Sequence, residues 1–318
     1  MSLGVSMPVV RVRDAQLAMV SGETVLECLE RNGYAIPSSC RAGTCRTCLA
    51  RATLGEVPAA AHVGLRPAEI EAGYFLPCVC RPRGDITLVD EAFPVVQACV
   101  LRKQLVGADV ALLHLRPDAD LHVIGGQCVH VQRDPGAPSR PYSVASGPGD
   151  STLELHVRRV VGGSVSPWLV DQLEVGESVL LRGPSGTCVY TDGDLAAPLV
   201  LIATSTGLAP LLGVIRRALH RGHHGPIRLH HGAATRSGLY LQPVLQTLER
   251  AHDNVRVLNS VRDEGGDLGS EIARMYADAS ALQCFLAGAP GLVHALRRQL
   301  FLQGAALSNI AADAFAAA

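Results

Sequence analysis

The sequence predicts a multidomain chain: an α+β segment, then an antiparallel β-sheet, then a doubly wound parallel α/β sheet. Three observations lead to this prediction. A length of 318 residues suggests two or three domains. Near Pro94 the pattern changes from short mixed elements to alternating strands, and near Ala196 it changes to strands that alternate with helices. We therefore expect domains at residues 1–92, 93–193 and 194–318.

The composition excludes several classes of protein. Hydrophobic residues make up 48% of the chain and charged residues 18%, so it can bury cores and is too apolar to be disordered. A formal net charge of -1 argues against a general nucleic-acid partner, which usually requires a basic surplus. The longest apolar run, near residues 195–203, is too short to span a bilayer, and residues 1–10 do not read as a secretory signal. We expect a cytoplasmic protein with no membrane partner.

A cluster of cysteines predicts a metal site. Cys40, Cys45 and Cys48 lie within nine residues, and Cys78 follows after 29 intervening residues. Without an export signal we expect reduced thiols, which favours metal binding over disulfides. The spacing is that of a plant-type [2Fe–2S] cluster, which takes four thiolate ligands. Zinc sites usually use two C-x-x-C pairs, and only one is present in this cluster; zinc or inert thiols are the alternatives.

The flanking residues agree with this interpretation. Residues 21–29 predict a turn and then an amphipathic helix that Gly33 closes, and residues 47–57 and 85–89 predict strands. Through these features and the cysteine motif, the segment over about residues 8–90 resembles a plant-type ferredoxin domain, which implies a β-grasp fold. The run Tyr74-Phe75-Leu76-Pro77-Cys78 matches that family's approach to its last ligand, with Cys80 as the alternative ligand. Arg46 stands where the family usually has glycine.

The middle of the chain predicts a small antiparallel barrel, with strands at 95–105, 110–115, 127–132 and 152–159. It contains the motif Arg140-Pro141-Tyr142-Ser143, and Gly162-Gly163-Ser164 and Gly183-Pro184-Ser185-Gly186 follow. Taken singly, Arg140 reads as a surface charge, Tyr142 as a core aromatic and Ser143 as a turn residue. The Gly-Gly-Ser run before an apolar stretch predicts a helix start whose free N–H groups suit a phosphate.

Together and in this order, these motifs resemble the flavin domain of the ferredoxin–NADP reductase superfamily. The resemblance implies that Arg140 pairs with the flavin phosphates, that Tyr142 packs on the isoalloxazine and that Ser143 hydrogen-bonds near N5. It also implies that the pyrophosphate meets Gly163, Val165 and Ser166. The family often has an aromatic residue near Cys188, and the absence of that residue leaves FMN as an alternative. The domain order favours FAD.

The last third predicts a doubly wound parallel sheet, which binds ligands at the carboxyl ends of its strands. An apolar strand at 199–203 leads to a helix at 211–219, and further strands are expected at 227–231, 255–261 and 282–287. The turn between the first strand and its helix resembles the superfamily's turn for the phosphates of a nicotinamide dinucleotide. That resemblance makes Thr206, Gly207 and Pro210 cofactor-binding residues.

Two motifs near the C-terminus extend the resemblance. Leu286-Ala287-Gly288-Ala289-Pro290 is similar to the family's late Cys-Gly-x-Pro motif, with Ala287 in the cysteine position and Gly288 as a cofactor-binding residue. Ala312-Asp313-Ala314-Phe315 resembles the terminal Asp-x-Phe, which implies that Phe315 covers the flavin; a frayed apolar tail is the alternative.

The choice of nicotinamide cofactor depends on one short segment. No acidic residue marks a ribose 2′-hydroxyl there, and Arg236 could meet a 2′-phosphate. Gly238-Leu239-Tyr240 nevertheless resembles the NADH-using branch. We expect NADH, with NADPH as the alternative.

Nearly the whole chain resembles the reductase components of bacterial multicomponent oxygenases and the reductase of a deoxysugar dehydratase. The resemblance implies that hydride passes from NAD(P)H to FAD, with Ser143 and Phe315 as catalytic residues. Single electrons then pass through the [2Fe–2S] cluster to an oxygenase, a Rieske-type ferredoxin or a dehydratase. A flavin is needed because nicotinamide gives two electrons at once and the cluster moves one. The alternatives are a redox sensor or electron carrier without nicotinamide turnover, and a stand-alone flavin reductase.

Three further groups of residues carry expectations. Arginines beside the cluster loop form either a docking face for an acidic partner or a set of solvated charges. Adjacent histidines are expected to be solvated or core residues rather than metal ligands, and the remaining cysteines to be small buried hydrophobes. These groups are Arg41, Arg46 and Arg51; His223, His224, His230 and His231; and Cys28, Cys99, Cys128, Cys188 and Cys284.

Overall fold

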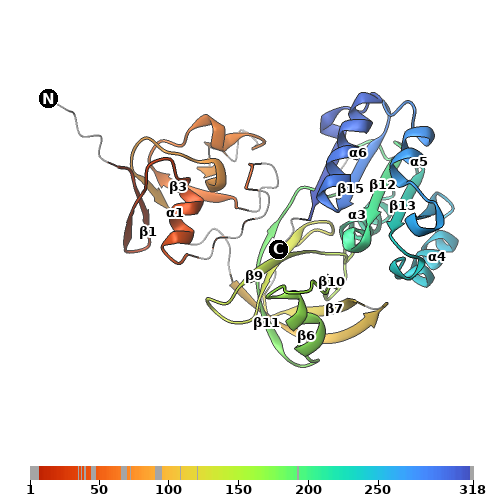
Figure 1. Ribbon diagram of the computed structural model, residues 1–318, viewed down its shortest axis with the longest axis horizontal. Helices are drawn as coiled ribbons and strands as arrows, with labels where there is room; N and C mark the ends of the chain where they lie inside the picture. The colour runs from red at the N-terminus through yellow and green to blue at the C-terminus, as the bar shows by residue number, and fades with distance from the viewer. Residues whose placement is uncertain are drawn as a thin grey trace. The chain divides into compact units, whose positions relative to one another are not determined.

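The computed structural model describes residues 7–315 except 35, 37, 39–40, 44–47, 66–69, 72, 90–94, 108, 120 and 192. The chain divides into two compact units, residues 1–94 and 95–318, which we call the N-terminal and C-terminal units (Figure 1). In the described parts of the chain, no helix combines the length and apolar character that a membrane crossing requires.

The N-terminal unit contains a mixed five-stranded sheet and the α-helix α1 (Val25–Arg31). The strand order is β2-β1-β5-β3-β4; β1 pairs antiparallel with β2 and parallel with β5. The core between sheet and helix contains Val10, Leu29 and Phe75, each fully buried. The strands are β1 (Val9–Val12), β2 (Ala15–Ala18), β3 (Ala50–Leu54), β4 (Tyr74–Phe75) and β5 (Ile86–Leu88), with 3-10 helices at Ala59–His62 and Pro77–Val79.

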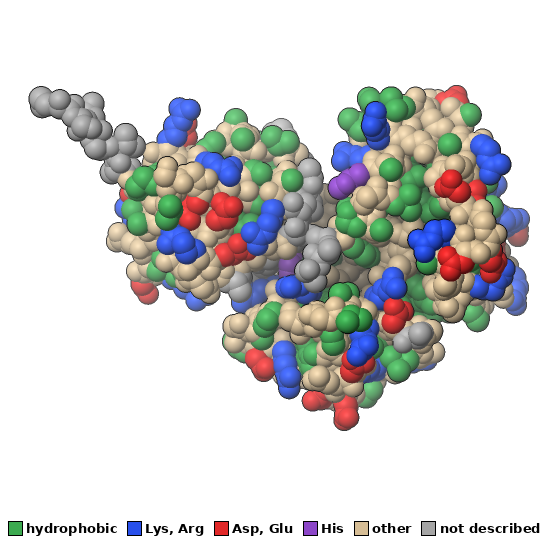
Figure 2. All heavy atoms as spheres, in the orientation of Figure 1, with side chains coloured by type: hydrophobic (Ala, Val, Ile, Leu, Met, Phe, Trp, Pro, Cys, Tyr) green, Lys and Arg blue, Asp and Glu red, His purple; other side chains and the backbone are tan. Residues whose placement is uncertain are grey.

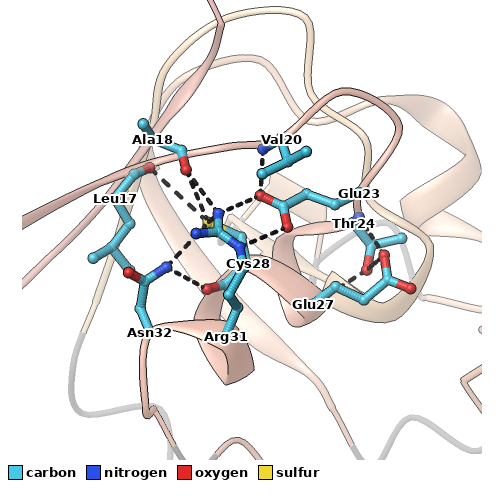
Figure 3. Close-up of polar contacts among 9 residues, drawn as sticks. All are labelled: Leu17, Ala18, Val20, Glu23, Thr24, Glu27, Cys28, Arg31 and Asn32. Carbon is cyan, nitrogen blue, oxygen red and sulfur yellow. Dashed lines mark hydrogen bonds and ion pairs between the residues drawn. The ribbon is translucent and has the colours of Figure 1, made fainter.

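Helix α1 forms where the sequence predicts it, because both of its ends carry local signals. Thr24 caps the first turn: its hydroxyl accepts from the Glu27 amide, and the Glu27 carboxylate accepts from the Thr24 amide. Arg31, in the last turn, reaches back to Glu23 at 2.7 Å (Figure 3). Gly33, with a φ of 81°, follows the helix end, as predicted.

The first sheet of the C-terminal unit, the flavin sheet, has six antiparallel strands in the order β10-β7-β6-β11-β8-β9. Its two end strands approach each other, since Val144, just after β9, forms a bridge with Leu155 of β10. Two strands, β9 and β11, were not predicted. The strands are β6 (Val95–Val106), β7 (Val110–Pro117), β8 (Cys128–Gln132), β9 (Ser139–Ser143), β10 (Leu153–Arg158) and β11 (Ser178–Ser185).

The predicted helix start at the Gly-Gly-Ser run is wrong by a few residues. The Gly163 amide donates to the Val160 carbonyl at 3.0 Å, which makes this run a turn. Helical residues begin at Ser166 and continue as a π-helix at Trp168–Gln172. Ser166 itself stabilises the turn, because its hydroxyl accepts from the Val160 amide at 3.0 Å.

The second sheet, the nicotinamide sheet, has five parallel strands in the order β14-β13-β12-β15-β16. Leu199 and Leu201 of β12 pack in the same cluster as α3, whereas Val200 and Ile202 pack in the same cluster as α6, so helices cover both faces. The elements are β12 (Leu199–Thr204), α3 (Leu208–His220), β13 (Ile227–Ala233), α4 (Gln242–Ala251), β14 (Val255–Val261), α5 (Leu268–Met275), β15 (Gln283–Gly288), α6 (Pro290–Leu302) and β16 (Ile310–Ala314).

One expectation for this sheet needs correction, and the alternative given for its C-terminal motif is not supported. Helix α3 begins at Leu208 rather than Leu211, because Pro210 is tolerated in a first turn. The C-terminal motif is not a frayed tail over its described residues: β16 pairs with β15, and the Phe315 amide donates to the Gly288 carbonyl at 2.9 Å.

The adjacent histidines and spare cysteines are mostly core residues. His230 and His231 lie on opposite faces of β13 and are both buried, since helices cover both faces of the sheet, and His223 is also buried. Of the five cysteines expected to be buried, Cys99 is the exception and is half-buried.

Figure 2 shows basic and acidic side chains interspersed on the face drawn.

Candidate functional site

Two of the four predicted cluster ligands are described, and they lie in one place. Cys48 follows the cysteine-rich loop, and Cys78 lies in the 3-10 helix Pro77–Val79; both are buried and pack in a common cluster with Leu26 and Leu76. Cys40 and Cys45, with Arg46, lie outside the described residues. The structure therefore brings together the described half of the predicted ligand set.

The alternative fourth ligand, Cys80, lies elsewhere. Its side chain is fully buried and packs in the core with Val25 and Phe75, not in the cluster of Cys48 and Cys78. Burial raises the pKa of the Cys80 thiol to about 12, so its thiolate form is disfavoured there. These observations favour Cys78 as the fourth ligand.

The loop that carries the cysteine motif lies against the turn that carries Cys78. Gly43 has a φ of 74°, and a Cβ at this position would lie 3.2 Å from Val79 Cγ2. At the same end of the unit, Arg41 forms an ion pair with Glu30 of α1 at 2.6 Å. The described residues thus fit a loop that wraps closely around a group held partly by Cys78.

The flavin motif lies on β9, at one end of the flavin sheet. Tyr142 packs against the core of this sheet, and burial raises the pKa of its hydroxyl. Arg140 is half-buried and donates to the Ser139 carbonyl at 2.9 Å. Because side chains alternate along a strand, Arg140 and Tyr142 share one face of β9 and Ser143 lies on the other.

Ser143 joins the two sheets of the C-terminal unit. Its hydroxyl donates to Asp313 Oδ2 at 2.8 Å, and Asp313 belongs to β16 of the nicotinamide sheet. Burial raises the pKa of Asp313, although the hydrogen bond from Ser143 opposes this shift. We did not predict Asp313 as a site residue; its only signal in the sequence is its place in the Asp-x-Phe motif.

The three residues predicted to meet the pyrophosphate, Gly163, Val165 and Ser166, are largely engaged within the protein. Val165 is buried in the core of the flavin sheet, so only its backbone could meet a phosphate. The Gly163 amide is already bonded within the turn, and the Ser166 hydroxyl accepts from the Val160 amide.

The dinucleotide turn lies where the strand order of the nicotinamide sheet reverses, between β12 and β15. Such switch points are where open α/β sheets bind ligands. Two glycines make the close approach possible. A Cβ at Gly207 would lie 2.2 Å from the Ala287 carbonyl oxygen, and a Cβ at Gly288 would lie 2.2 Å from Thr204 Oγ1.

The remaining predicted residues gather around this turn. Thr206 is buried beside Gly207, and Pro210 is buried in the first turn of α3. Phe315, half-buried, is bonded through its amide to Gly288. Since Asp313 pairs with Ala287 in the sheet, the flavin motif, the dinucleotide turn and the C-terminal motif all meet at this edge.

A buried polar network that we did not predict also crosses between the two sheets. On β10, Glu154 accepts from Arg216 of α3 and bonds His156, each at 2.8 Å. The other ring nitrogen of His156 bonds the Tyr240 hydroxyl at 2.8 Å, and His231 packs edge-on against Tyr240. We call Arg216, Glu154, His156 and Tyr240 the inter-sheet network.

The network has strongly shifted pKa values. Burial alone would raise the pKa of Glu154, but the hydrogen bond from His156 and the charge of Arg216 outweigh it and lower the pKa to about 2. Burial lowers the pKa of His156, against the attraction of Glu154. The ionised form of Glu154 is therefore the form that the fold stabilises.

We predict that Cys78→Ser removes the metal cluster and that Cys80→Ala does not. A serine hydroxyl does not replace a thiolate ligand, whereas Cys80 lies in an apolar core. Iron content and the visible absorption of the purified protein measure the outcome. Loss of iron in Cys80→Ala with retention in Cys78→Ser would reverse the assignment.

We also predict that Glu154→Gln lowers the free energy of unfolding of the C-terminal unit by about 2 kcal/mol at pH 7. The Glu154 pKa is depressed on folding, so its stabilisation is present above 4.5 and is lost as the pH falls toward about 2. The variant should therefore show a flatter loss of stability with acid.

Urea unfolding followed by the fluorescence of Trp168, the single tryptophan of the chain, measures this effect. The exposed Glu174→Gln is a matched control in the same unit. If Glu154→Gln and the wild type lose the same free energy of unfolding as the pH falls, the prediction is contradicted.

Comparison with protein families identifies three successive domains. Residues 10–83 match the 2Fe-2S iron-sulfur cluster binding domain, residues 97–190 the oxidoreductase FAD-binding domain and residues 201–298 the oxidoreductase NAD-binding domain. These matches confirm the expected [2Fe–2S], FAD and nicotinamide cofactors.

Curated relatives match over most of the chain. The ferredoxin–NAD(P)(+) reductase component of the naphthalene 1,2-dioxygenase/salicylate 5-hydroxylase systems of Ralstonia sp is 31% identical, covering 96% of this chain and 98% of the relative. The aromatic O-demethylase reductase subunit of Amycolatopsis is 34% identical over 76% and 77% of the two chains. The CDP-6-deoxy-L-threo-D-glycero-4-hexulose-3-dehydrase reductase of Yersinia pseudotuberculosis is 26% identical over 92% and 93%.

Among solved structures, the Amycolatopsis cytochrome P450 reductase matches with a TM-score of 0.72 and 28% identity, covering 98% of this chain and 99% of that one. The ferredoxin reductase in carbazole 1,9a-dioxygenase shares the fold, with a TM-score of 0.67 and 22% identity over 97% and 98% of the chains. These findings confirm the resemblance inferred from the motifs. The chain is an oxidoreductase that belongs to the family of ferredoxin–NAD(P)(+) reductase components, which combine a 2Fe-2S domain with FAD-binding and NAD-binding domains.

Proposed function

We propose that this chain takes hydride from NADH at the junction of Ser143, Asp313 and the dinucleotide turn, and delivers single electrons through a cluster held by Cys40, Cys45, Cys48 and Cys78. The observation that carries this proposal is the hydrogen bond from Ser143 to Asp313, because it joins the flavin motif to the switch point of the nicotinamide sheet. A bound FAD supplies the chemistry that accepts two electrons and releases them singly.

Ser143 and Asp313 form a hydrogen-bonded pair that can hold a proton at this junction. The Ser143 hydroxyl already donates to Asp313 Oδ2, and burial raises the pKa of that carboxyl. A carboxyl with a raised pKa behind a hydroxyl can take up or return a proton at the hydroxyl oxygen. Asp313 thus acts through Ser143 and is a positioning residue in this proposal.

Other residues bind and cover the cofactors. Arg140 holds the flavin phosphates by its charge, Tyr142 supports the flavin ring, and Gly163, Val165 and Ser166 belong to the turn and helix start that lie near the pyrophosphate in this proposal. Thr206, Gly207, Pro210 and Gly288 form the turn that holds the dinucleotide in this proposal. The clash that a Cβ would cause at either glycine supports the close packing of this turn between β12 and β15. Phe315, tied to Gly288, covers the flavin ring and excludes water.

The proposal extends to the finer architecture. The bridge from Val144 to Leu155 supports a flavin sheet closed into a barrel. The mixed sheet of the N-terminal unit and the helix α1 support a β-grasp domain. Thiolate ligands for iron favour a reducing compartment such as the cytoplasm.

The proposed acceptor is a separate redox protein: an oxygenase, a Rieske-type ferredoxin or a dehydratase. Relatives carry names from dioxygenase, O-demethylase and hexulose dehydrase systems. Arg41, beside the cluster loop, is exposed, although its guanidinium pairs with Glu30. We propose that Arg41, Arg46 and Arg51 attract an acidic face of that partner, so that higher salt slows its reduction.

We predict that the protein oxidises NADH and reduces both cytochrome c and ferricyanide, and that Cys48→Ser abolishes only the cytochrome reaction. Ferricyanide can take electrons directly from the flavin, whereas the proposed one-electron route requires the cluster. Absorbance changes under anaerobic conditions measure both reactions. Persistence of both in the variant would remove the cluster from the route, and no NADH oxidation would indicate a carrier without nicotinamide turnover.

We further predict that Asp313→Asn slows flavin reduction by NADH at least about tenfold, because it removes the group that exchanges a proton with Ser143. Anaerobic stopped-flow absorbance measures this rate, and its pH profile should lose the ionisation seen in the wild type. Flavin content checks that the site still forms, and the exposed Asp118→Asn is the control for charge. An unchanged rate and pH profile would exclude the proposed role of Asp313.

A further inference from the structure

Arg236 and Glu264 lie together at the carboxyl edge of the nicotinamide sheet. Arg236 follows β13, and Glu264 follows β14, the neighbouring strand. The two connections are tied by the backbone as well, because the Asp263 amide donates to the Ala234 carbonyl at 3.0 Å. In dinucleotide-binding sheets, this edge is where the adenosine ribose is recognised.

The Nε and Nη2 edge of the Arg236 guanidinium is engaged by one carboxylate. Its Nε donates to Glu264 Oε1 at 2.7 Å, and its Nη2 donates to Glu264 Oε2 at 2.5 Å. This two-point geometry is the one that an arginine would otherwise offer to a phosphate. The partnership lowers the pKa of Glu264 and raises that of Arg236, so both remain charged at neutral pH.

The neighbouring polar groups are a pair of hydroxyls and a second carboxylate. The hydroxyls of Thr235 and Ser237, on either side of Arg236, bond each other at 2.9 Å. Asp263 adds a second carboxylate next to Glu264, and it lies 3.6 Å from Arg262 Nε. Two acidic groups thus lie near the arginine of the segment that follows β13.

Stability does not account for this pair. The side chains of Arg236 and Glu264 are 76% and 44% exposed, and exposed ion pairs of this kind contribute little to folding. Their place at the ribose-binding edge gives the pair a different consequence. A 2′-phosphate that takes the Nε and Nη2 edge of Arg236 must displace Glu264 and then sits beside an uncompensated carboxylate, whereas a cofactor with a 2′-hydroxyl has no such need.

We propose that Glu264 is the residue that makes this reductase prefer NADH over NADPH, by occupying the guanidinium of Arg236. The inference rests on the proposed function in one respect only, that a nicotinamide dinucleotide binds at this sheet edge. It goes beyond that function because it names the group that selects between the two cofactors.

The experiment compares binding of 2′,5′-ADP and 5′-ADP to the holoprotein by titration calorimetry. Glu264→Gln should strengthen binding of 2′,5′-ADP about five- to tenfold relative to 5′-ADP, because it releases the Nε and Nη2 donors of Arg236 for the phosphate. The ratio of kcat/KM for NADPH to that for NADH should rise in parallel. Both gains should shrink as ionic strength rises.

Three further variants make the test specific. Arg236→Ala combined with Glu264→Gln should lose the gain, because the guanidinium that Glu264→Gln releases is then absent. Asp263→Asn removes a neighbouring charge without freeing Arg236, and Asp253→Asn removes an exposed charge at the opposite end of β14; neither should give the full gain.

The outcomes separate this inference from the proposed function. An unchanged ratio of 2′,5′-ADP to 5′-ADP affinity in Glu264→Gln would overturn the role of Glu264, as would an equal gain in Asp263→Asn. A wild-type protein that oxidises neither NADH nor NADPH would instead overturn the proposed function, whatever the calorimetry shows.

Discussion

The C-terminal unit depends on buried polar contacts that join its two sheets. Glu154 and His156 of the flavin sheet are held between Arg216 and Tyr240 of the nicotinamide part, and Ser143 bonds Asp313 at a second place. Buried polar groups are costly unless each finds a partner, so these contacts favour one relative placement of the sheets. That placement matters because hydride transfer requires a flavin and a nicotinamide to meet in one orientation.

A steric constraint explains the position of the glycines at the switch point. Gly207 and Gly288 lie where β12 and β15 diverge, and each faces backbone or side-chain atoms that leave no room for a Cβ. Bulk there would push the dinucleotide turn away from β15 and, through the sheet, from Asp313. The geometry that admits the cofactor and the contact that positions Ser143 are therefore coupled by adjacent strands.

Ion pairs in the two units differ in how far they are exposed to solvent. Around the cluster loop of the N-terminal unit, Arg41 is exposed and paired only at the surface, which suits an encounter with another protein. In the C-terminal unit, Glu154 pairs with Arg216 in a largely buried position, whereas Arg236 and Glu264 form an exposed pair. Arg41 and Arg236 thus both lie in exposed ion pairs, and the Glu154 pair lies between the two sheets of the C-terminal unit.

The sequence by itself determined the elements whose signals are local. The cysteine spacing, the capped helix after Thr24, the apolar strand that becomes β12 and the glycine turn after it depend on residues close together in the chain, so a linear pattern reveals them. The cofactor classes followed from those motifs. The short strand β9 was not visible as a strand, because its proline and polar residues obscure the alternation.

Only the tertiary structure decided which of these residues act together. Ser143 and Asp313 are 170 residues apart, and Arg236 meets Glu264 across 28. The core packing likewise separated Cys78 from Cys80, which a two-residue spacing could not do. Such choices depend on pairing, burial and desolvation between distant segments, and these arise only when the sheets have formed and packed.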